Sequence, residues 1–268
     1  MKILIKIIIF LFLFIVSLFF YQKLFLQKKQ PPFSSHIQKN PFFIIGHRGA
    51  CGYEPENTLS SFQKALELGV DKIELDVYVC KTGELVVFHD QDVDRITNGQ
   101  GKISDLSFKE LQSLLVKGKE HIPTLDEAIT FINRKVPLII ELKGPNIAQP
   151  VAELLKKYLA NGWDSQDFTV SSFDHEQLAE FKKLCPDIQT GALFSWWNMP
   201  QNDILEAKLL HVNFIGIDVT TVTDKIVSKI HHAGFLLFVW TINDKETADQ
   251  MRTMKIDGIF SNYPDRVR

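Results

Sequence analysis

Short apolar runs rich in β-branched residues recur from residue 42 to the C-terminus, separated by segments with helical periodicity. The runs are almost continuously hydrophobic, which is typical of parallel strands covered on both faces. They span residues 42–49, 72–80, 84–90, 137–144, 168–173, 190–194, 214–220, 235–242 and 257–264. Helices are predicted at residues 57–69, 107–115, 124–134, 147–162, 175–184, 224–234 and 245–254, and Asn57 or Thr58 can cap the first of them. This alternation predicts an α/β fold.

Nine strands exceed the eight of a (β/α)8 TIM barrel, and the connection lengths identify the additional one. Only residues 81–84 separate the second and third runs. That is enough for a hairpin, whereas a crossover between parallel strands needs about a dozen residues. The third run is therefore predicted to pair antiparallel with the second, while the other eight close as a barrel. The alternative is an open doubly wound sheet, but no G-x-G-x-x-G turn follows the first strand.

The N-terminal segment differs from the rest of the chain. Residues 3–20 are almost entirely apolar and lysines flank them on both sides, which predicts a hydrophobic helix within residues 1–26. Residues 27–41 contain Pro31, Pro32 and Pro41 and are predicted to be a linker to a domain at 42–268. We expect an uncleaved membrane anchor with the domain on the extracytoplasmic side. The alternative is a cleaved signal and a secreted or periplasmic protein, although no A-x-A site follows the apolar run.

Composition narrows the classes of partner. The 268 residues carry a formal net charge of −2, so no basic field would attract nucleic acid, and none is expected as a partner. The spacing of Cys51, Cys80 and Cys185 indicates neither a disulfide framework nor a zinc site. The sequence predicts no oligomeric state.

Acidic residues recur at the predicted C-terminal ends of strands, where barrel enzymes carry their active sites. Glu74 and Asp76 are two residues apart on one strand, so their side chains point to the same face. Carboxylates this close repel unless a cation lies between them. Glu141 adds a third carboxylate on the next barrel strand, with Lys143 two residues further. An all-oxygen set of this kind predicts one Mg²⁺ or Ca²⁺ rather than zinc.

The hairpin brings His89 towards this predicted metal site. A turn centred on residues 82–83 would place His89 opposite Asp76, within a slip of one or two residues. His47 ends the first strand, next to the strand that carries Glu74.

Two histidines beside a metal-bound anion suit the acid–base cleavage of a phosphodiester near neutral pH. His47 and His89 would fill these roles, although the sequence does not say which is the acid. Arg48 and Lys143 could contact the phosphate oxygens, since the arginine fork suits bidentate binding.

The motifs that carry these residues resemble the glycerophosphodiester phosphodiesterase family, in order and across residues 42–268. They are HRG and PENT within 47–58, ELDV at 74–77, VVFHD at 86–90, DRITNGQGKISDLSFKEL at 94–111, ELK at 141–143, SSF at 171–173 and WTIND at 240–244. The resemblance implies a (β/α)8 barrel that hydrolyses glycerophosphodiesters to glycerol 3-phosphate and an alcohol.

It also implies roles for individual residues. The acid–base pair would be His47 and His89, and the ligands of Mg²⁺ or Ca²⁺ would be Glu74, Asp76 and Glu141. The resemblance further implies that Arg48 and Lys143 contact the phosphate. Glu56 would be a supporting carboxylate, and Trp240 would form an apolar wall of the pocket. The family pattern usually ends in T-D-x-P, where this chain has Ser261 and Asn262, so fine substrate positioning stays open.

The stretch of residues 91–123 is short, with one helix at most, and predicts a compact cap over an open pocket mouth. Small head groups and longer lipid substrates would then both fit. One alternative function is a membrane-proximal lysophospholipase D, because the N-terminal anchor would hold the pocket mouth close to the bilayer. Another is a phosphodiester-binding protein without turnover.

Overall fold

The computed structural model describes residues 42–195 and 203–268. The predicted hydrophobic helix within residues 1–26 and the linker at 27–41 lie outside this part of the chain. None of the helices in the described ranges combines the length and the apolar character needed to cross a bilayer.

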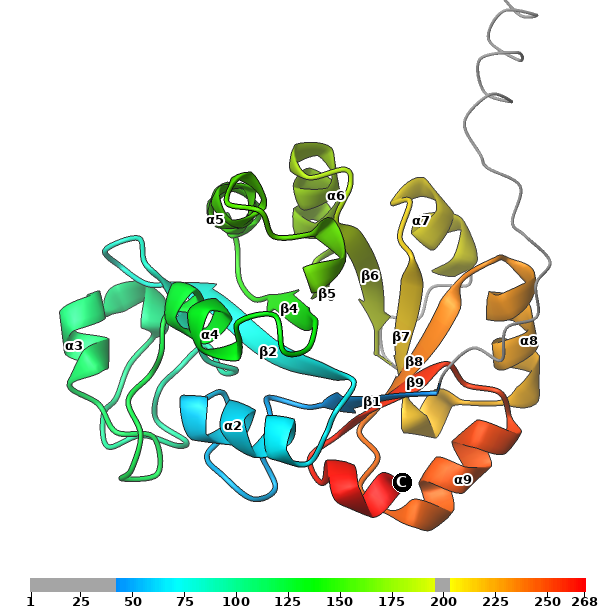
Figure 1. Ribbon diagram of the computed structural model, residues 1–268. Coiled ribbons are helices and arrows are strands. Elements are labelled where there is room, and N and C mark those ends of the chain that lie inside the picture. The colour runs from blue at the N-terminus through cyan, green and yellow to red at the C-terminus, as the bar shows by residue number, and fades with distance from the viewer. Residues whose placement is uncertain (1–41, 196–202) are drawn as a thin grey trace, which may run out of the picture. The chain divides into compact units, whose positions relative to one another are not determined.

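Nine strands form one sheet in the order β1-β9-β8-β7-β6-β5-β4-β2-β3, and a further pairing joins β1 to β2. They are β1 (Phe43–Gly46), β2 (Lys72–Val79), β3 (Leu85–Val87), β4 (Leu138–Leu142), β5 (Phe168–Ser172), β6 (Gln189–Phe194), β7 (Phe214–Asp218), β8 (Leu236–Trp240) and β9 (Gly258–Ser261). All pairings are parallel except that of β2 with β3. The predicted (β/α)8 barrel with one added antiparallel strand is confirmed (Figure 1).

Helices surround the strands (Figure 1). They are α2 (Leu59–Glu67), α3 (Phe108–Gln112), α4 (Leu125–Ile132), α5 (Ala148–Ala160), α6 (His175–Leu184), α7 (Asp203–Leu209), α8 (Asp224–His232) and α9 (Lys245–Thr253). Each lies within a predicted helical segment except α7, which the sequence pattern did not reveal. Seven residues complete only about two turns, and apolar periodicity is ambiguous over so short a window.

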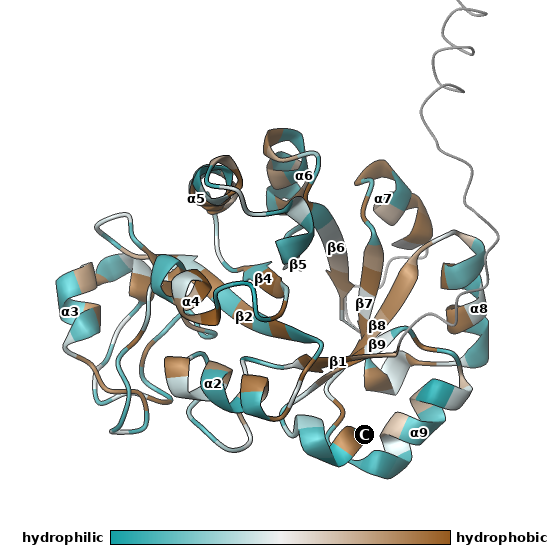
Figure 2. Ribbon diagram, viewed as in Figure 1, coloured by the Kyte–Doolittle hydropathy of each residue, from teal (hydrophilic) through white to brown (hydrophobic). Residues whose placement is uncertain are grey.

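Two separate cores hold the barrel together. The inner core fills the barrel with strand side chains that include Ile45, Ile139 and Phe238. The outer core lies between the strands and the helices, and it includes Leu75 and Val77 of β2. Because side chains alternate along a strand, Glu74 and Asp76 point away from this outer core. Figure 2 shows apolar residues along most of the strands, and both apolar and polar residues on the surrounding helices.

Residues 91–123 form a small cap beside the barrel, with α3 and the 3-10 turn Ile103–Asp105. The cap has its own hydrophobic cluster, in which Val93, Ile103 and Leu111 pack against Phe88. This matches the compact cap expected from its length. Its cluster fixes the segment that follows β3, and therefore fixes His89.

The hairpin differs from the prediction by one residue. Cys80 pairs with Glu84 across a three-residue loop, and Gly83 in this loop has a φ of 99°. The expected two-residue turn would have set His89 opposite Asp76. Instead, the amide of Phe88 donates to the carbonyl of Asp76 at 3.0 Å. The shift falls within the expected slip, and His89 still lines the pocket.

Candidate active site

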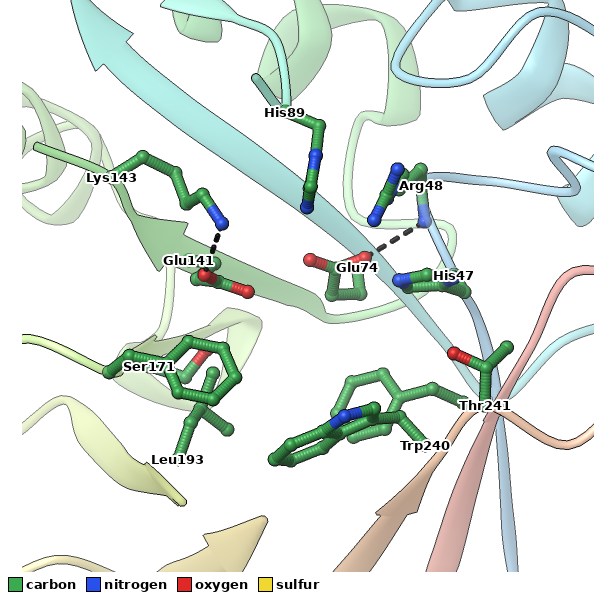
Figure 3. A pocket seen from close by; sticks show the side chains of 12 residues that line it. His47, Arg48, Glu74, His89, Glu141, Lys143, Ser171, Leu193, Trp240 and Thr241 are labelled. Carbon is green, nitrogen blue, oxygen red and sulfur yellow. Dashed lines mark hydrogen bonds and ion pairs between the residues drawn. The ribbon is translucent and has the colours of Figure 1, made fainter. Parts of the chain in front are cut away.

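A pocket with a volume of about 140 Å³ opens where the barrel strands end. Its charged and imidazole side chains come from β2 and β4 and from the segments that follow β1, β3 and β4; they are His47, Arg48, Glu74, His89, Glu141 and Lys143. Figure 3 shows the basic and imidazole side chains converging on Glu74 and Glu141. Residues far apart in the sequence are thus brought into one cavity.

Three buried carboxylates form the acidic side of this site. Side-chain oxygens of Glu74, Asp76 and Glu141 lie within 4.8 Å of one another. The parallel register of β2 and β4 places Asp76 directly beside Glu141, and Glu74 is on the same face two residues earlier. The arrangement follows from strand geometry, and these three residues could hold a metal ion.

Crowding shifts the pKa values of the carboxylates in different directions. Burial, together with the nearby charge of Asp76, raises the pKa of Glu74 well above its usual value. Burial likewise raises the pKa of Glu141 to about 7, against the influence of Lys143. Lys143 and Arg48 outweigh burial at Asp76 and lower its pKa. A buried cluster in which two carboxyl groups resist ionisation fits a hard divalent cation, because the cation would favour their charged forms.

Two basic side chains border the carboxylates. Lys143 Nζ lies 2.9 Å from Glu141 Oε1 and 3.7 Å from Asp76 Oδ1. The backbone N–H of Arg48, which has a φ of 52°, donates to Glu74 Oε2 at 2.8 Å. The Nε of Arg48 is buried without a hydrogen-bond partner among the described residues, and it lies 3.6 Å from Asp76 Oδ2 in an ion pair.

Asn57 is a site residue that the sequence did not reveal. We expected Asn57 or Thr58 to cap the helix at 57–69, and Thr58 caps α2. Asn57 instead has a φ of 59° and donates from Nδ2 to Asp76 Oδ2 at 2.8 Å. Asparagine tolerates this left-handed conformation better than most residues. Its place in the PENT motif was the only signal, and a cap explained it equally well.

His47 is oriented by Asn262. The two side chains meet at 2.6 Å between His47 Nδ1 and Asn262 Oδ1. An amide oxygen only accepts, so Nδ1 carries the proton and Nε2 is left as an acceptor. Burial, followed by the charge of Arg48, lowers the pKa of His47 to about 4. The Cys51 thiol donates to the same Asn262 oxygen at 3.0 Å.

His89 has a different partner. Its Nδ1 lies 2.6 Å from Asp90 Oδ1. Burial is the main cause that lowers the pKa of His89; Arg48 and Lys143 also lower it, whereas Asp76 and Asp90 oppose them. The two histidines thus face one pocket with unlike supports, an amide behind His47 and a carboxylate behind His89.

Comparison with known proteins agrees with this geometry. Residues 47–266 match the model of the glycerophosphoryl diester phosphodiesterase family. The chain belongs to this family. A glycerophosphodiester phosphodiesterase of Caldanaerobacter subterraneus is 35% identical over 236 residues, which cover 83% of this chain and 94% of the relative. Another from Bacillus altitudinis is 34% identical over 237 residues, covering 83% and 95%.

Solved structures agree as well. An Oleispira antarctica phosphodiesterase, solved with the product sn-glycerol-3-phosphate, has a TM-score of 0.77 and 32% identity. The similarity covers 84% of this chain and 94% of that one. The family and the enzyme class expected from the motifs are therefore confirmed, which favours an enzyme over a phosphodiester-binding protein without turnover.

An apolar wall faces the charged side of the pocket in this protein. Trp240 was expected there, and Phe173, Leu193 and Phe260 lie beside it. The rings of Phe173 and Trp240 meet edge to face with centroids 5.4 Å apart. We did not single out the other three, because their apolar side chains look like ordinary strand residues. Only barrel closure shows that they surround the cavity.

The amide partner of His47 leads to a first prediction. Replacing Asn262 by aspartate puts a negative charge beside Nδ1 and favours the imidazolium, so we expect Asn262→Asp to raise the pKa of His47 above about 4. NMR titration of the metal-free protein measures this, with the exposed His121 as an internal control. An unchanged or lower His47 pKa in the variant would contradict the orientation described above.

Proposed function

We propose that the chain hydrolyses glycerophosphodiesters to glycerol 3-phosphate and an alcohol, using one divalent cation and the pair His47 and His89. The observation that carries this proposal is the pocket that both imidazoles share with Glu74, Glu141 and two basic side chains, where Asp76 completes a cluster of three carboxylates. Such a set can bind a phosphodiester, neutralise it and move protons on both sides of the scissile bond.

Glu74, Asp76 and Glu141 would hold the cation. A bound Mg²⁺ or Ca²⁺ would supply positive charge that polarises a phosphoryl oxygen. The raised pKa values of Glu74 and Glu141 support this role. They indicate that the positive charge of nearby protein side chains does not fully offset the burial of these carboxylates.

The proton transfers would fall to the two histidines. One would accept a proton from the attacking oxygen, and the other would donate a proton to the leaving alkoxide. His47 is neutral near pH 7 and its Nε2 is free to accept. Each ring has its Nδ1 held by a partner, so the Nε2 atoms are the ones that would exchange protons with the substrate.

Arg48 and Lys143 would contact the phosphate oxygens, and Glu56 would support Arg48 from behind. The product glycerol 3-phosphate in the Oleispira antarctica relative supports the same phosphate-bearing product for this chain. Trp240 would cover the carbon skeleton of the substrate.

Purified protein is expected to release glycerol 3-phosphate from glycerophosphocholine or glycerophosphoethanolamine when Mg²⁺ or Ca²⁺ is present. His47→Ala and His89→Ala should each lower kcat by about 10² to 10⁴-fold, because each removes one proton-transfer group. His121→Ala is the matched control, since its ring is exposed and contacts the carbonyl of Gln112. An enzyme-coupled glycerol 3-phosphate assay measures all three. No release from any head group would refute the proposal.

Metal binding gives a prediction that can be tested without measuring activity. Mg²⁺ or Ca²⁺ should raise the thermal midpoint of the wild-type protein, because a ligand that binds only the folded state stabilises it. Glu141→Gln should lose most of that increase without a lower midpoint in the chelator-treated sample, since it also removes like-charge repulsion. Glu153→Gln is the control, because Glu153 is an exposed residue of α5. An equal metal-induced increase in Glu141→Gln and wild type would show that the ion binds elsewhere.

A lysophospholipid is the second candidate substrate. The apolar wall formed by Trp240, Phe173 and Leu193 favours it, and the human lysophospholipase D GDPD1 is 25% identical over 287 residues, covering 91% of this chain. Strand β1 starts at Phe43 and ends next to His47, so the pocket opens at the far end of the barrel from residue 42.

The membrane anchor rests on the hydropathy of residues 3–20, whereas lysines on both flanks leave its orientation open; the extracytoplasmic side is the location that we propose. We expect the full-length protein to sediment with membranes and to resist extraction by alkaline carbonate, and we expect intact cells to expose the domain to added protease.

The membrane preparation would be given lysophosphatidylcholine and glycerophosphocholine in parallel. Release from both substrates supports a lysophospholipase D activity, whereas release from glycerophosphocholine alone excludes it. Recovery in the carbonate supernatant would exclude the anchor.

A further inference from the structure

Arg95 of the cap binds two carboxylates at once. Its Nη1 and Nη2 donate to the two oxygens of Glu56 at 3.0 and 2.6 Å. Its Nε donates to Asp90 Oδ2 at 2.5 Å. All three nitrogens of the guanidinium are used, and a lysine could not reproduce this geometry because its ammonium is a single point of charge.

Each of these carboxylates is also bound to a residue of the pocket. The other oxygen of Asp90 contacts His89 Nδ1 at 2.6 Å. Glu56 accepts from Arg48 Nη1 at 2.8 Å. Arg95 therefore lies at the centre of a chain of contacts that runs from His89 to Arg48. Among the described residues Arg95 is outside the pocket lining, whereas His89 and Arg48 are within it.

Arg95 joins two stretches of chain, the loop between β1 and α2 and the segment that follows β3 and leads into the cap. Arg48 and Glu56 belong to the loop between β1 and α2, His89 and Asp90 follow β3, and Arg95 begins the cap. Loops of this kind tolerate small displacements, and a displacement of about 1 Å at a reacting group can cost about 10²-fold in rate. A side chain that fixes both loops would therefore affect the rate more than the fold.

The exposure of the Arg95 side chain also indicates that Arg95 affects the rate more than the stability of the fold. The side chain of Arg95 is 48% exposed, and exposed ion pairs contribute little to stability. Glu56 and Asp90 are 10% and 25% exposed, so the guanidinium closes the network on the solvent side.

We propose that Arg95 is a positioning residue, which holds Asp90 and Glu56 so that His89 and Arg48 stay aligned on the phosphodiester. The inference rests on the proposed function, because His89 and Arg48 are given their roles there. It adds a residue of the cap to the catalytic arrangement, which makes the cap part of the active site and not only a cover beside the barrel.

The decisive variant is Arg95→Lys, which keeps the charge and removes the fork. We expect kcat for glycerophosphocholine to fall about 10- to 100-fold, with KM changed less than about threefold and the thermal midpoint within about 2 °C of wild type. Arg134→Lys is the matched control, because Arg134 is 45% exposed and paired with Asp167 away from the pocket. Equal kcat values in both variants would overturn the proposal. So would a lower midpoint with an unchanged kcat per folded molecule.

A background variant tests whether Arg95 acts through its partners. In Asp90→Asn with Glu56→Gln, the further change Arg95→Lys should lower kcat less than twofold, because the contacts it would break are already weakened. A full 10- to 100-fold further loss in that background would show that Arg95 acts by another route, and would overturn the proposal.

A spectroscopic measurement separates this inference from the proposed activity. Long-range ¹H–¹⁵N spectra of His89, recorded without substrate, should change in Arg95→Lys and match wild type in Arg134→Lys. If wild type releases no glycerol 3-phosphate but the His89 signals change, the activity is refuted and the positioning role of Arg95 stands. If wild type is active and the His89 signals of Arg95→Lys match wild type, the positioning role alone is refuted.

Discussion

The site depends on one electrostatic constraint, the burial of three carboxylates within 4.8 Å of one another. Carboxylates this close cannot all ionise without compensating charge, and the pKa values of Glu74 and Glu141 rise accordingly. Lys143 approaches Glu141, and the backbone amide of Arg48 turns towards Glu74. These groups thus compensate part of the negative charge of the three carboxylates, which together could hold a cation.

The barrel is what makes such crowding possible. Neighbouring parallel strands put Asp76 beside Glu141, while the opposite faces of the same strands pack into the outer hydrophobic core. The favourable burial of that core stabilises a structure that carries a costly cluster at one end. The loops bring only the adjustable groups, the imidazoles and the guanidiniums, whose partners then set their direction. The acidic cluster therefore faces imidazoles whose directions are set by their hydrogen-bond partners.

The two histidines show how partners distinguish similar side chains. The Nδ1 atom of His47 contacts the neutral amide of Asn262, whereas that of His89 contacts the carboxylate of Asp90. Asp90 in turn accepts a hydrogen bond from Arg95. The T-D-x-P pattern of the family would put a carboxylate in the position of Asn262. The departure noted in the sequence therefore bears on the imidazole of His47.

Local sequence determined the elements of this protein and the types of its chemical groups. Near-continuous apolar runs predicted the strands, the short connection after β2 predicted the hairpin, and the i, i+2 spacing of Glu74 and Asp76 predicted that they share a face. These features depend on residues that are close in the chain, where backbone geometry alone decides which side chains meet. The one-residue difference at the hairpin arose from the loop size, which sequence spacing leaves open.

Tertiary structure alone decided which distant groups meet. Asn262 reaches His47 across 215 residues, and Arg95 reaches Glu56 across 39. Asn57 looked like a helix cap and Phe173 like a core residue, because each side chain fits a local role equally well. Their contacts arise from barrel closure and from the packing of the cap, which depend on the whole chain and leave no periodic trace in the sequence.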